Sequence, residues 1–247
     1  MVTKIKFFFI TLKNEKLRTN HMIRELKKLN IKYEIFYGTK GKDLTHKELS
    51  LYSKNETFKS EKRDMSLDEI SACLSHIRIY QKIIKNKYKA TMIFEDDVVI
   101  NKDLISILNN LHKFPKKWQL INFLSDAKEK TFMCNINIFK NYKFTKFLEK
   151  ANRACAYLIT YETAKILLRD ALPIRRPPDA LTGRFGLKDL DSYSISPKLI
   201  QLKDFPTSIE YRNTFFGKYK FLSWIIKTKY IFFLIKIISF TKKIIKK

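Results

Sequence analysis

An α/β fold with a mostly parallel central sheet is predicted by the order of apolar segments in the first part of the chain. Residues 7–12 form a nearly continuous apolar run, which is typical of a parallel strand that is buried on both faces. The amphipathic stretch 15–29 follows, and a second apolar segment lies at 31–37. A strand, a helix and a strand in this order form the βαβ unit of an α/β fold.

A second, longer helix is predicted to begin after Ser66. Ser66 and Glu69 have the S-x-x-E spacing of a capping box, and apolar residues recur on one helical face up to about residue 89. The short apolar strand 90–94 comes next. The same signals then predict a helix at 104–111, a strand at 120–124, a strand at 155–160 and a helix at 161–172.

Three segments carry weaker signals. The polar stretch 45–64 and residues 126–150 give no clear prediction. Residues 175–206 are rich in Pro, Gly, Asp and Ser, so we expect a loop there. We therefore expect one Rossmann-like α/β domain over residues 1–217, with a separate tail over residues 218–247.

The chain of 247 residues carries a formal net charge of +26. This charge indicates an anionic partner, such as nucleic acid, a membrane surface or a phosphate-bearing substrate. Lysine supplies 40 of the 50 basic residues, whereas arginine is usually preferred for bidentate recognition of phosphates and bases. A solvated, lysine-rich surface is therefore the alternative for the body of the chain.

The tail 218–247 is basic and amphipathic. It has lysines but no acidic residue, and on a helix many of its lysines fall along one stripe, opposite an apolar side. Its longest charge-free stretch, 230–235, is far shorter than the roughly 20 residues that a spanning helix needs. The pattern predicts a helix that lies on an anionic membrane surface. A terminal helix packed on the domain is the alternative.

The amino terminus and the cysteines both favour a cytoplasmic location. No signal peptide is expected, because Lys4 and Lys6 interrupt a first apolar run that is already short. Cys73, Cys134 and Cys155 are odd in number and widely spaced, which excludes a disulfide scaffold and a thiolate zinc cluster.

The strongest chemical signal is the acidic triplet Glu95, Asp96 and Asp97, directly after strand 90–94. In open α/β sheets, ligands bind beyond the carboxyl ends of the strands. Acids in that position can chelate a divalent metal, and the metal can neutralise a diphosphate. Where the strand bends, one acid can face the metal and another the ribose of a nucleotide. A solvated acidic turn is the alternative.

The motifs around this triplet resemble those of glycosyltransferase family 25, the family of the bacterial lipooligosaccharide galactosyltransferases. That family typically has a G-E-I-x-C-x-x-S-H helix followed by a hydrophobic strand that ends in L-E-D-D. The matching residues, in order, are Glu69, Ile70, Cys73, Ser75, His76, Glu95, Asp96 and Asp97.

Weaker matches extend the resemblance over most of the chain before the tail. Residues 9–12 with Arg18 resemble the family's V-I-N-L opening and its following arginine. Residues 156–168 resemble its Y-L-I segment, and Pro178 and Asp179 resemble its P-x-D element.

The resemblance implies a GT-A-like fold and an inverting, metal-dependent transfer of a hexose to a lipooligosaccharide or lipopolysaccharide acceptor. The expected donor is a UDP-sugar, UDP-galactose first. The expected cofactor is Mn²⁺ or Mg²⁺ held by Glu95 and Asp97. The residues expected to bind the donor are Thr11, Leu12, Arg18, Ser75, His76, Glu95 and Asp96.

The same resemblance implies the partners and the location. Besides the UDP-sugar, we expect a lipid-linked oligosaccharide acceptor and an anionic membrane surface that binds the tail, and no nucleic acid. The expected location is the inner face of the cytoplasmic membrane.

An inverting transfer also needs a base that deprotonates the acceptor hydroxyl. Asp179 is the candidate, and Asp126 and Asp191 compete with it. His76 is a donor-site candidate only through the resemblance, because a histidine at the edge of a helix is more often a packed residue with one satisfied nitrogen.

Three residues depart from the family pattern. Thr11 replaces an asparagine, Asp68 replaces a glycine, and Arg153 replaces a small residue. The Thr11 and Asp68 departures leave room for a catalytically inactive, membrane-peripheral relative. A bulky Arg153 near the binding cleft would alter substrate choice, and a local salt bridge is the alternative for it. A nucleic-acid-binding protein is a second rival because of the charge, but no nucleic-acid motif is recognisable and the acidic triplet would repel phosphates without a metal.

Overall fold

The computed structural model describes residues 5–124, 132–147, 153–184 and 190–205. The chain divides into two units, Met1–Glu210 and Tyr211–Lys247, and the second unit lies outside the described residues. The basic helix expected over 218–247 and the boundary expected at residue 217 therefore stay predictions.

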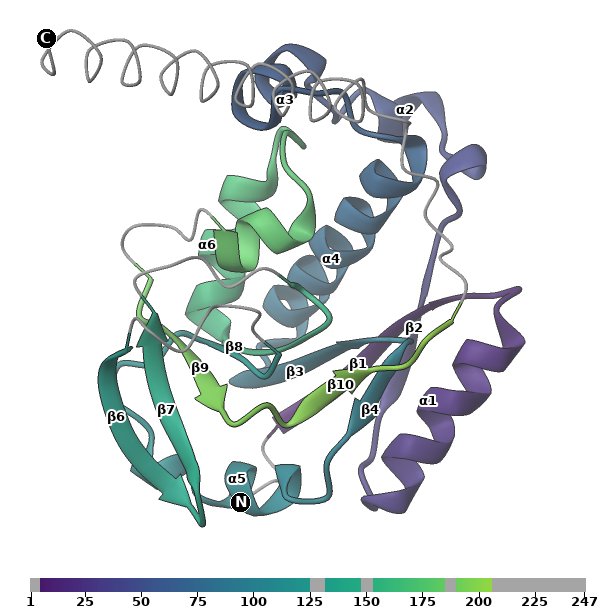
Figure 1. Ribbon diagram of the computed structural model, residues 1–247. Coiled ribbons are helices and arrows are strands. Elements are labelled where there is room, and N and C mark those ends of the chain that lie inside the picture. Colours follow the sequence, from purple (N-terminus) through teal and green to yellow (C-terminus); the bar gives the residue numbers. More distant parts are fainter. Residues whose placement is uncertain (1–4, 125–131, 148–152, 185–189, 206–247) are drawn as a thin grey trace, which may run out of the picture. The chain divides into compact units, whose positions relative to one another are not determined.

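Helices and strands alternate along the first part of the chain (Figure 1). The elements, in order, are β1 (Ile5–Leu12), α1 (Lys16–Lys28), β2 (Glu34–Gly38), η2 (Gly41–Asp43), α2 (His46–Leu49), α3 (Lys54–Glu61), α4 (Leu67–Asn86), β3 (Ala90–Glu95), β4 (Val98–Ile100), α5 (Leu104–Asn109), η3 (Leu111–Lys113), β5 (Leu120–Asn122), β6 (Phe132–Phe139), β7 (Tyr142–Phe147), β8 (Ala156–Thr160), α6 (Tyr161–Ala171), η4 (Ala180–Arg184), β9 (Ser192–Ser196) and β10 (Ile200–Leu202). The helices and strands predicted between residues 7 and 172 are present, with ends that differ by a few residues.

The central sheet has the strand order β2-β1-β3-β8-β5-β9-β7-β6. β1 is parallel to β2 and β3, and β5 is parallel to β9. β8 runs antiparallel to its neighbours β3 and β5, and β7 runs antiparallel to β9 and β6. Only β8 and β7 therefore oppose the common direction of this sheet, which confirms the predicted α/β class with a mostly parallel sheet.

Helices pack on both faces of the sheet, because alternate side chains of a strand point to opposite faces. On one face Phe7 and Phe9 of β1 pack with Met22 of α1 and with α5. On the other face Phe8 and Ile93 pack with α4 and α6, which lie side by side (Figure 1). The carboxyl ends of β1 and β3 consequently meet at one edge of the sheet, with α1 on one face and α4 on the other.

The loop predicted for residues 175–206 is wrong over its last part, where β9 and β10 form. The Ser-Tyr-Ser-Ile-Ser sequence of β9 favoured a loop, yet β9 lies inside the sheet between β5 and β7. Backbone partners on both sides satisfy its polar groups, and the buried Ser194 accepts a hydrogen bond from Thr145 Oγ1 through its carbonyl. Pairing with distant strands thus outweighed local propensity.

The segments without a clear prediction also have regular structure. α2 and α3 lie within residues 45–64, and the β6–β7 hairpin lies within residues 126–150. Within the described ranges, no helix combines the length and the apolar character that crossing a membrane requires.

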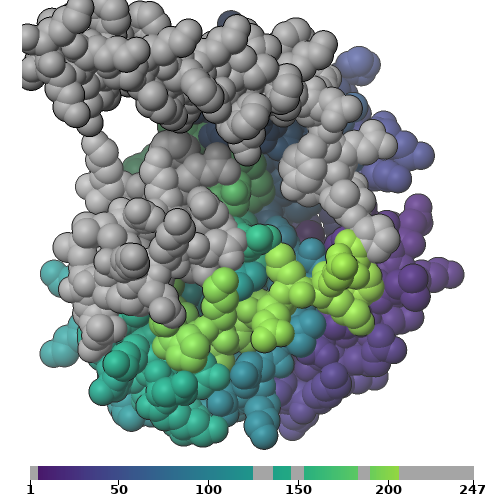
Figure 2. All heavy atoms as spheres, in the orientation of Figure 1, coloured from purple at the N-terminus to yellow at the C-terminus, as the bar shows by residue number. Residues whose placement is uncertain are grey.

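β10 brings the last described residues to the acidic triplet. It pairs antiparallel with β4, which begins directly after Asp97, and the Lys203 N–H donates a hydrogen bond to the Asp97 carbonyl at 2.7 Å. In Figure 2 the yellow-green segment that contains β10 crosses the visible face and reaches the purple amino-terminal segment. The turn between β3 and β4 is therefore held by residues from both ends of the described chain.

Candidate active site

The acidic triplet lies at the carboxyl end of β3, where the prediction placed it. Glu95 is the last residue of β3, and Asp96 and Asp97 form the turn that leads into β4. β1 pairs in parallel with β3 up to Ile10 and Glu95, so Thr11 and Leu12 follow at the same edge of the sheet. Three acids and the end of β1 are thus close together, as ligand binding beyond the strand ends requires.

Asp96 points to the α1 face of the sheet and is paired there. Its Oδ1 accepts a hydrogen bond from Arg18 at 2.7 Å, and its Oδ2 accepts one from Thr11 Oγ1 at 2.7 Å. All three side chains are buried. Burial raises the pKa of the Asp96 carboxyl, although the Thr11 and Arg18 hydrogen bonds oppose that rise. The structure therefore joins three of the predicted donor-binding residues to one another.

Asp97 has a less favourable environment than its neighbour. Burial and the nearby Glu95 carboxylate raise the pKa of the Asp97 carboxyl to about 6. Arg18 forms a long ion pair with it, with 3.7 Å between Nη1 and Oδ2. Among the described residues, the buried Asp97 Oδ1 has no hydrogen-bond partner. A buried carboxylate oxygen without a partner is unfavourable, and a cation that bound it would remove that penalty.

Glu95 points to the opposite face, toward α4. Its Oε1 is 3.6 Å from His76 Nε2, and its side chain is 38% exposed while that of His76 is 4% exposed. The acids of the triplet thus lie on two sides of the sheet: Asp96 faces α1, and Glu95 faces α4 and solvent. That one acid faces a metal and another a ribose stays a prediction.

The residues present fit a divalent cation that is completed by its substrate. Within the part of the chain that the structure describes, no group of three or more His, Cys, Asp or Glu side chains could hold a metal. Glu95 and Asp97 nevertheless supply two carboxylates at one strand end. Mg²⁺ is commonly bound by one or two carboxylates together with substrate phosphates and water, so this donor set suits it.

Phe205 lies at the site, although no sequence pattern indicates it. Its ring lies 5.2 Å from the Arg18 guanidinium carbon and 5.4 Å from the His21 ring. Arg18 is thus held by Asp96 on one side and an aromatic ring on another. The contact depends on the pairing of β10 with β4, and no local pattern around Phe205 indicates it.

Ser75 and Leu12 lie near the site, but neither has an exposed polar group on its side chain. Ser75 is buried on α4, and its Oγ donates to the Ser71 carbonyl one turn earlier. That Oγ lies only 2.7 Å from where a Cβ on Gly38 would sit, so the end of β2 packs directly on it. Leu12 is half-buried and also contacts Gly38. The donor-binding roles predicted for both residues stay predictions.

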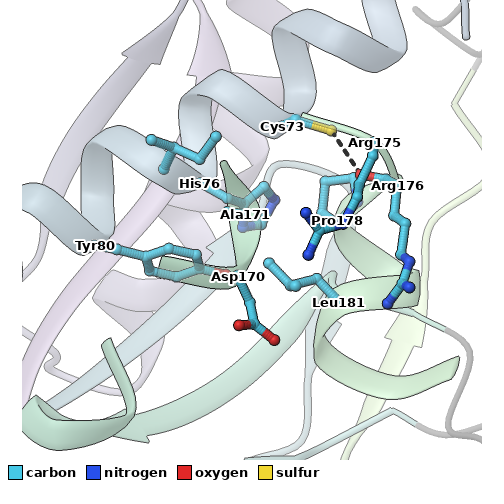
Figure 3. A pocket seen from close by; sticks show the side chains of 10 residues that line it. Cys73, His76, Tyr80, Asp170, Ala171, Arg175, Arg176, Pro178 and Leu181 are labelled. Carbon is cyan, nitrogen blue, oxygen red and sulfur yellow. Dashed lines mark hydrogen bonds between the residues drawn. The ribbon is translucent and has the colours of Figure 1, made fainter. Parts of the chain in front are cut away.

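A small pocket lies between α4 and the chain that follows α6 (Figure 3). Its lining residues are Cys73, His76, Ile77, Tyr80, Asp170, Ala171, Arg175, Arg176, Pro178 and Leu181. Figure 3 shows Cys73, His76 and Tyr80 on one side of it. His76 lines this pocket and also faces Glu95. The His76 side chain therefore lies between the pocket and the acidic triplet.

The three candidate bases lie in different places. Asp179 precedes η4, next to the pocket residue Pro178, and its charge acts on Arg63 and Cys73. Asp191 precedes β9; its carbonyl accepts a hydrogen bond from the Gln119 N–H, and its own N–H donates to Gln119 Oε1. These bonds and the sheet register place Asp191 at the amino-terminal edge of the sheet, which is the opposite edge from the acidic triplet. Asp126 lies outside the described residues.

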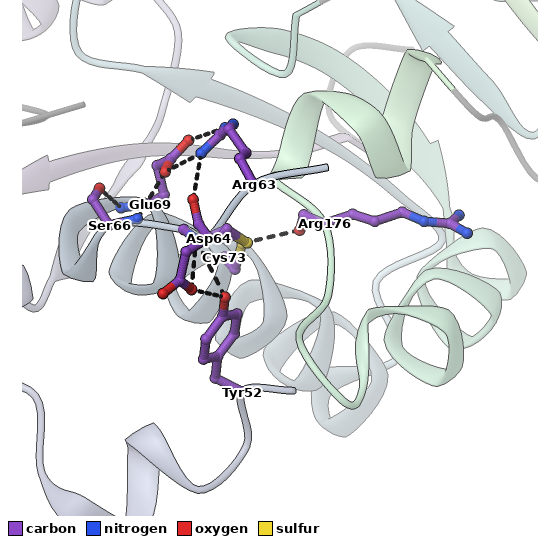
Figure 4. Close-up of polar contacts among 8 residues, drawn as sticks. Tyr52, Arg63, Asp64, Ser66, Glu69, Cys73 and Arg176 are labelled. Carbon is purple, nitrogen blue, oxygen red and sulfur yellow. Dashed lines mark hydrogen bonds and ion pairs between the residues drawn. The ribbon is translucent and has the colours of Figure 1, made fainter. Parts of the chain in front are cut away.

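A second polar cluster surrounds the start of α4; we call Tyr52, Arg63, Asp64, Ser66 and Glu69 the α4 entry cluster (Figure 4). Ser66 and Glu69 form the predicted capping box. Glu69 also receives two hydrogen bonds from the Arg63 guanidinium, one of them at 2.8 Å. Tyr52 donates to Asp64 Oδ1, and the Met65 N–H donates to the same oxygen. This family-matched glutamate stabilises the helix start.

The departures from the family pattern have local structural roles. Thr11 supplies a hydrogen bond to Asp96. Asp68 Oδ1 accepts a hydrogen bond from the Gly41 N–H at 3.0 Å, which ties η2 to α4. The Arg153 side chain is exposed, and its carbonyl accepts a hydrogen bond from Asn122. None of these three departures replaces a carboxylate of the acidic triplet, which we also call the acidic turn.

Comparison with known proteins points to one family. The family model described as "Glycosyltransferase family 25 (LPS biosynthesis protein)" matches residues 4–182. Procollagen galactosyltransferase 2 from Homo sapiens is 28% identical over 126 residues, which are 47% of this chain and 20% of that protein. A glycosyltransferase 25 family member from Anopheles gambiae is 25% identical over 224 residues, which are 78% of this chain and 36% of that protein. The chain thus spans well under half the length of these relatives.

Solved structures with a similar chain trace are distant. A197 from STIV aligns with a TM-score of 0.40 at 12% identity, over 85% of this chain and 99% of that chain. A glycosyltransferase involved in the glycosylation of the major capsid of PBCV-1 aligns with a TM-score of 0.36 at 9% identity, over 68% of this chain and 66% of that chain. Both scores are below 0.5, so neither likeness carries an argument.

Proposed function

This chain belongs to glycosyltransferase family 25, and from that premise we propose that it transfers a hexose from a UDP-sugar to a hydroxyl of an acceptor sugar. Galactose is the first donor to test, because the curated relative from Homo sapiens is named a galactosyltransferase. The proposed acceptor is a lipid-linked lipooligosaccharide or lipopolysaccharide, and the proposed transfer inverts the anomeric centre.

One observation carries the proposal. Asp97, at the carboxyl end of a central strand and beside a second carboxylate, has a buried oxygen for which the described residues supply no hydrogen-bond partner. Hydrogen bonds from Arg18 and Thr11 satisfy Asp96, whereas Asp97 Oδ1 has no hydrogen-bond partner among the described residues. This arrangement supports cation binding at Glu95 and Asp97 in the presence of a diphosphate.

Each residue has a role in the proposed reaction. Glu95 and Asp97 would hold Mn²⁺ or Mg²⁺, which when bound neutralises charge on the departing nucleoside diphosphate. Asp96 fixes Arg18 at the end of β1, where the guanidinium favours the anionic nucleotide. Asp179 is the proposed base for the acceptor hydroxyl, since it lies beside a pocket that reaches His76.

The tail provides the proposed link to the acceptor. Residues 218–247 contain only basic charged residues with apolar residues between them. We propose that they bind the anionic inner face of the cytoplasmic membrane, where a lipid-linked acceptor is available. No nucleic acid partner is proposed.

A UDP-release assay with the full chain tests the proposal. UDP-galactose, UDP-glucose and UDP-N-acetylglucosamine would each be tested with a lipooligosaccharide acceptor, in Mn²⁺, in Mg²⁺ and in a chelator. We expect turnover with one donor, dependence on the metal, and a loss of at least about 100-fold in Asp97→Ala. Asp43→Ala, which removes an exposed carboxylate on η2, is the matched control. Full turnover by Asp97→Ala, or in the chelator, would contradict the metal role.

A further inference from the structure

Three polar side chains form a buried hydrogen-bonded chain that leads to Glu95. The Tyr80 hydroxyl is 3.0 Å from the Tyr157 hydroxyl, which is 2.7 Å from His76 Nδ1. The other ring nitrogen of His76, Nε2, is the atom that lies 3.6 Å from Glu95 Oε1. Tyr80 and Tyr157 are 0% exposed and His76 is 3% exposed.

Helix periodicity and sheet register together create this chain. His76 and Tyr80 are four residues apart on α4, so they lie on one face of the helix. Tyr157 of β8 is directly opposite Ile93 of β3, and such pairs point to the same face of a sheet. Glu95 follows Ile93 by two residues and therefore shares that face. Tyr157 and Glu95 thus both point at α4.

The surroundings of the two hydroxyls are apolar. The cluster around Tyr80 and Tyr157 includes Phe8, Ile159 and Leu167. Phenylalanine would fill the same space without a polar group to bury, and a buried hydroxyl without a partner is unfavourable. Among the described residues, the two hydroxyls form hydrogen bonds with each other and with His76. Their effect is therefore on the histidine.

The direction of the hydrogen bonds determines the tautomer of His76. Burial raises the pKa of both phenols well above the ordinary value, so each hydroxyl keeps its proton. If Tyr80 donates to Tyr157 and Tyr157 donates to Nδ1, the proton of a neutral His76 is on Nε2. If instead Nδ1 carried the only proton, the Nε2 lone pair would face the Glu95 carboxylate, which is repulsive. The arrangement with the proton on Nε2 avoids this repulsion and keeps the hydrogen bonds between the two hydroxyls and Nδ1.

We propose that Tyr157, supported by Tyr80, is a positioning residue that holds His76 with its Nε2–H directed at Glu95 and so orients this carboxylate for the cation. At 3.6 Å the two atoms are too far apart for a hydrogen bond, but a rotation of the half-exposed Glu95 side chain would close the gap. Residues behind a metal ligand commonly set its orientation in this way. The inference rests on the proposed function, because it assumes that Glu95 binds a cation.

Cation binding by four variants of the full chain tests the inference. Mn²⁺ is titrated in the presence of UDP, and the free ion is followed by electron paramagnetic resonance. We expect Tyr157→Phe to weaken the apparent Mn²⁺ affinity about tenfold, and Tyr80→Phe to weaken it less, because the Tyr157–His76 contact remains. Tyr88→Phe is the matched control, since it removes a hydroxyl on the same face of the sheet outside the chain. Its affinity should equal that of the wild type.

The fourth variant, Glu95→Gln, separates the two possible failures. If Glu95→Gln leaves Mn²⁺ affinity unchanged, the proposed cation site itself is wrong. If Glu95→Gln weakens binding but Tyr157→Phe matches Tyr88→Phe, only the positioning role is wrong.

A measurement on the wild type covers the case in which Tyr157→Phe does not fold. Long-range ¹H–¹⁵N correlation spectra distinguish the two neutral tautomers of His76. We expect the proton on Nε2. A neutral ring with its proton on Nδ1 would overturn the inference without any variant.

Discussion

The α4 entry cluster contains one residue that matches the family 25 motifs, Glu69, whereas all three acids of the acidic turn, Glu95, Asp96 and Asp97, match them. The carboxylates of the two regions have different partners. In the α4 entry cluster, Glu69 has a guanidinium and a helix cap as partners, and Asp64 accepts two hydrogen bonds. In the acidic turn, Asp96 has such partners, whereas Asp97 has a buried oxygen that finds no partner within the described part of the chain. The first arrangement stabilises the fold. The second is unfavourable to the free protein and is relieved by a ligand, which is typical of functional sites.

Exchanging a carboxylate for an amide in each region should give the largest contrast, and the readout is turnover. Glu95→Gln removes a proposed cation ligand, and we expect a loss of about 100-fold or more in kcat/KM for the UDP-sugar. Glu69→Gln is the same chemical change in the α4 entry cluster, and its folded fraction should keep near-normal turnover. Equal losses of kcat/KM in both variants would show that the acidic turn is no more important for turnover than the α4 entry cluster.

The second contrast is in the free energy of unfolding. Glu69→Ala leaves the buried side of Arg63 without its counter-charge and removes half of the capping box. We expect a loss of about 3 kcal/mol in the free energy of unfolding, measured by urea denaturation. Glu162→Ala is the control, because its ion pair with Lys165 is exposed and should contribute little. A Glu69→Ala variant as stable as this control would contradict the assigned role.

Asp97→Asn should change stability in the opposite direction. Because the folded-state pKa of Asp97 is raised to about 6 from 3.8, the native state binds this proton more tightly than the unfolded chain does. The ionised carboxylate therefore destabilises the native state above pH 6, and this effect disappears as the pH falls toward 3.8. We expect the variant to be more stable than the wild type by about 3 kcal/mol at pH 7.5 without metal.

The pH series provides the check on that prediction. Urea denaturation from pH 7.5 to pH 4.5 should show the advantage of Asp97→Asn shrinking steadily, while Asp43→Asn tracks the wild type throughout. An advantage that does not depend on pH would mean that ionisation of Asp97 is not its cause.

The smallest expected effect concerns a departure from the family pattern. Asp68→Gly restores the family's usual residue but removes the acceptor for the Gly41 N–H and places glycine in the first turn of α4. We expect a loss of about 1–2 kcal/mol in the free energy of unfolding, measured by urea denaturation, with turnover unchanged. Asp68→Asn keeps an acceptor oxygen and should lose less. A loss of turnover in Asp68→Gly would place this residue in the functional site.

Features of the fold and site that depend on residues close together in the sequence could be predicted. The capping box of Ser66 and Glu69 spans four residues, and the structure contains it as expected. The acids at the end of β3 were also predicted, because an apolar run followed by charge marks a strand end. β9 could not be predicted in the same way, since its serines become acceptable only when β5 and β7 flank them.

The sequence by itself determined the fold class, the family and the position of the acidic triplet, because these depend on local periodicity and on motif order. Only the tertiary structure decided which acid is paired and which is not. Asp96 contacts Thr11 and Arg18, and His76 contacts Tyr157, through hydrogen bonds between residues 78 to 85 positions apart. Such contacts arise from strand register and from the face of a helix that packs on the sheet, and a shift of one residue in the register would reverse which face each acid occupies.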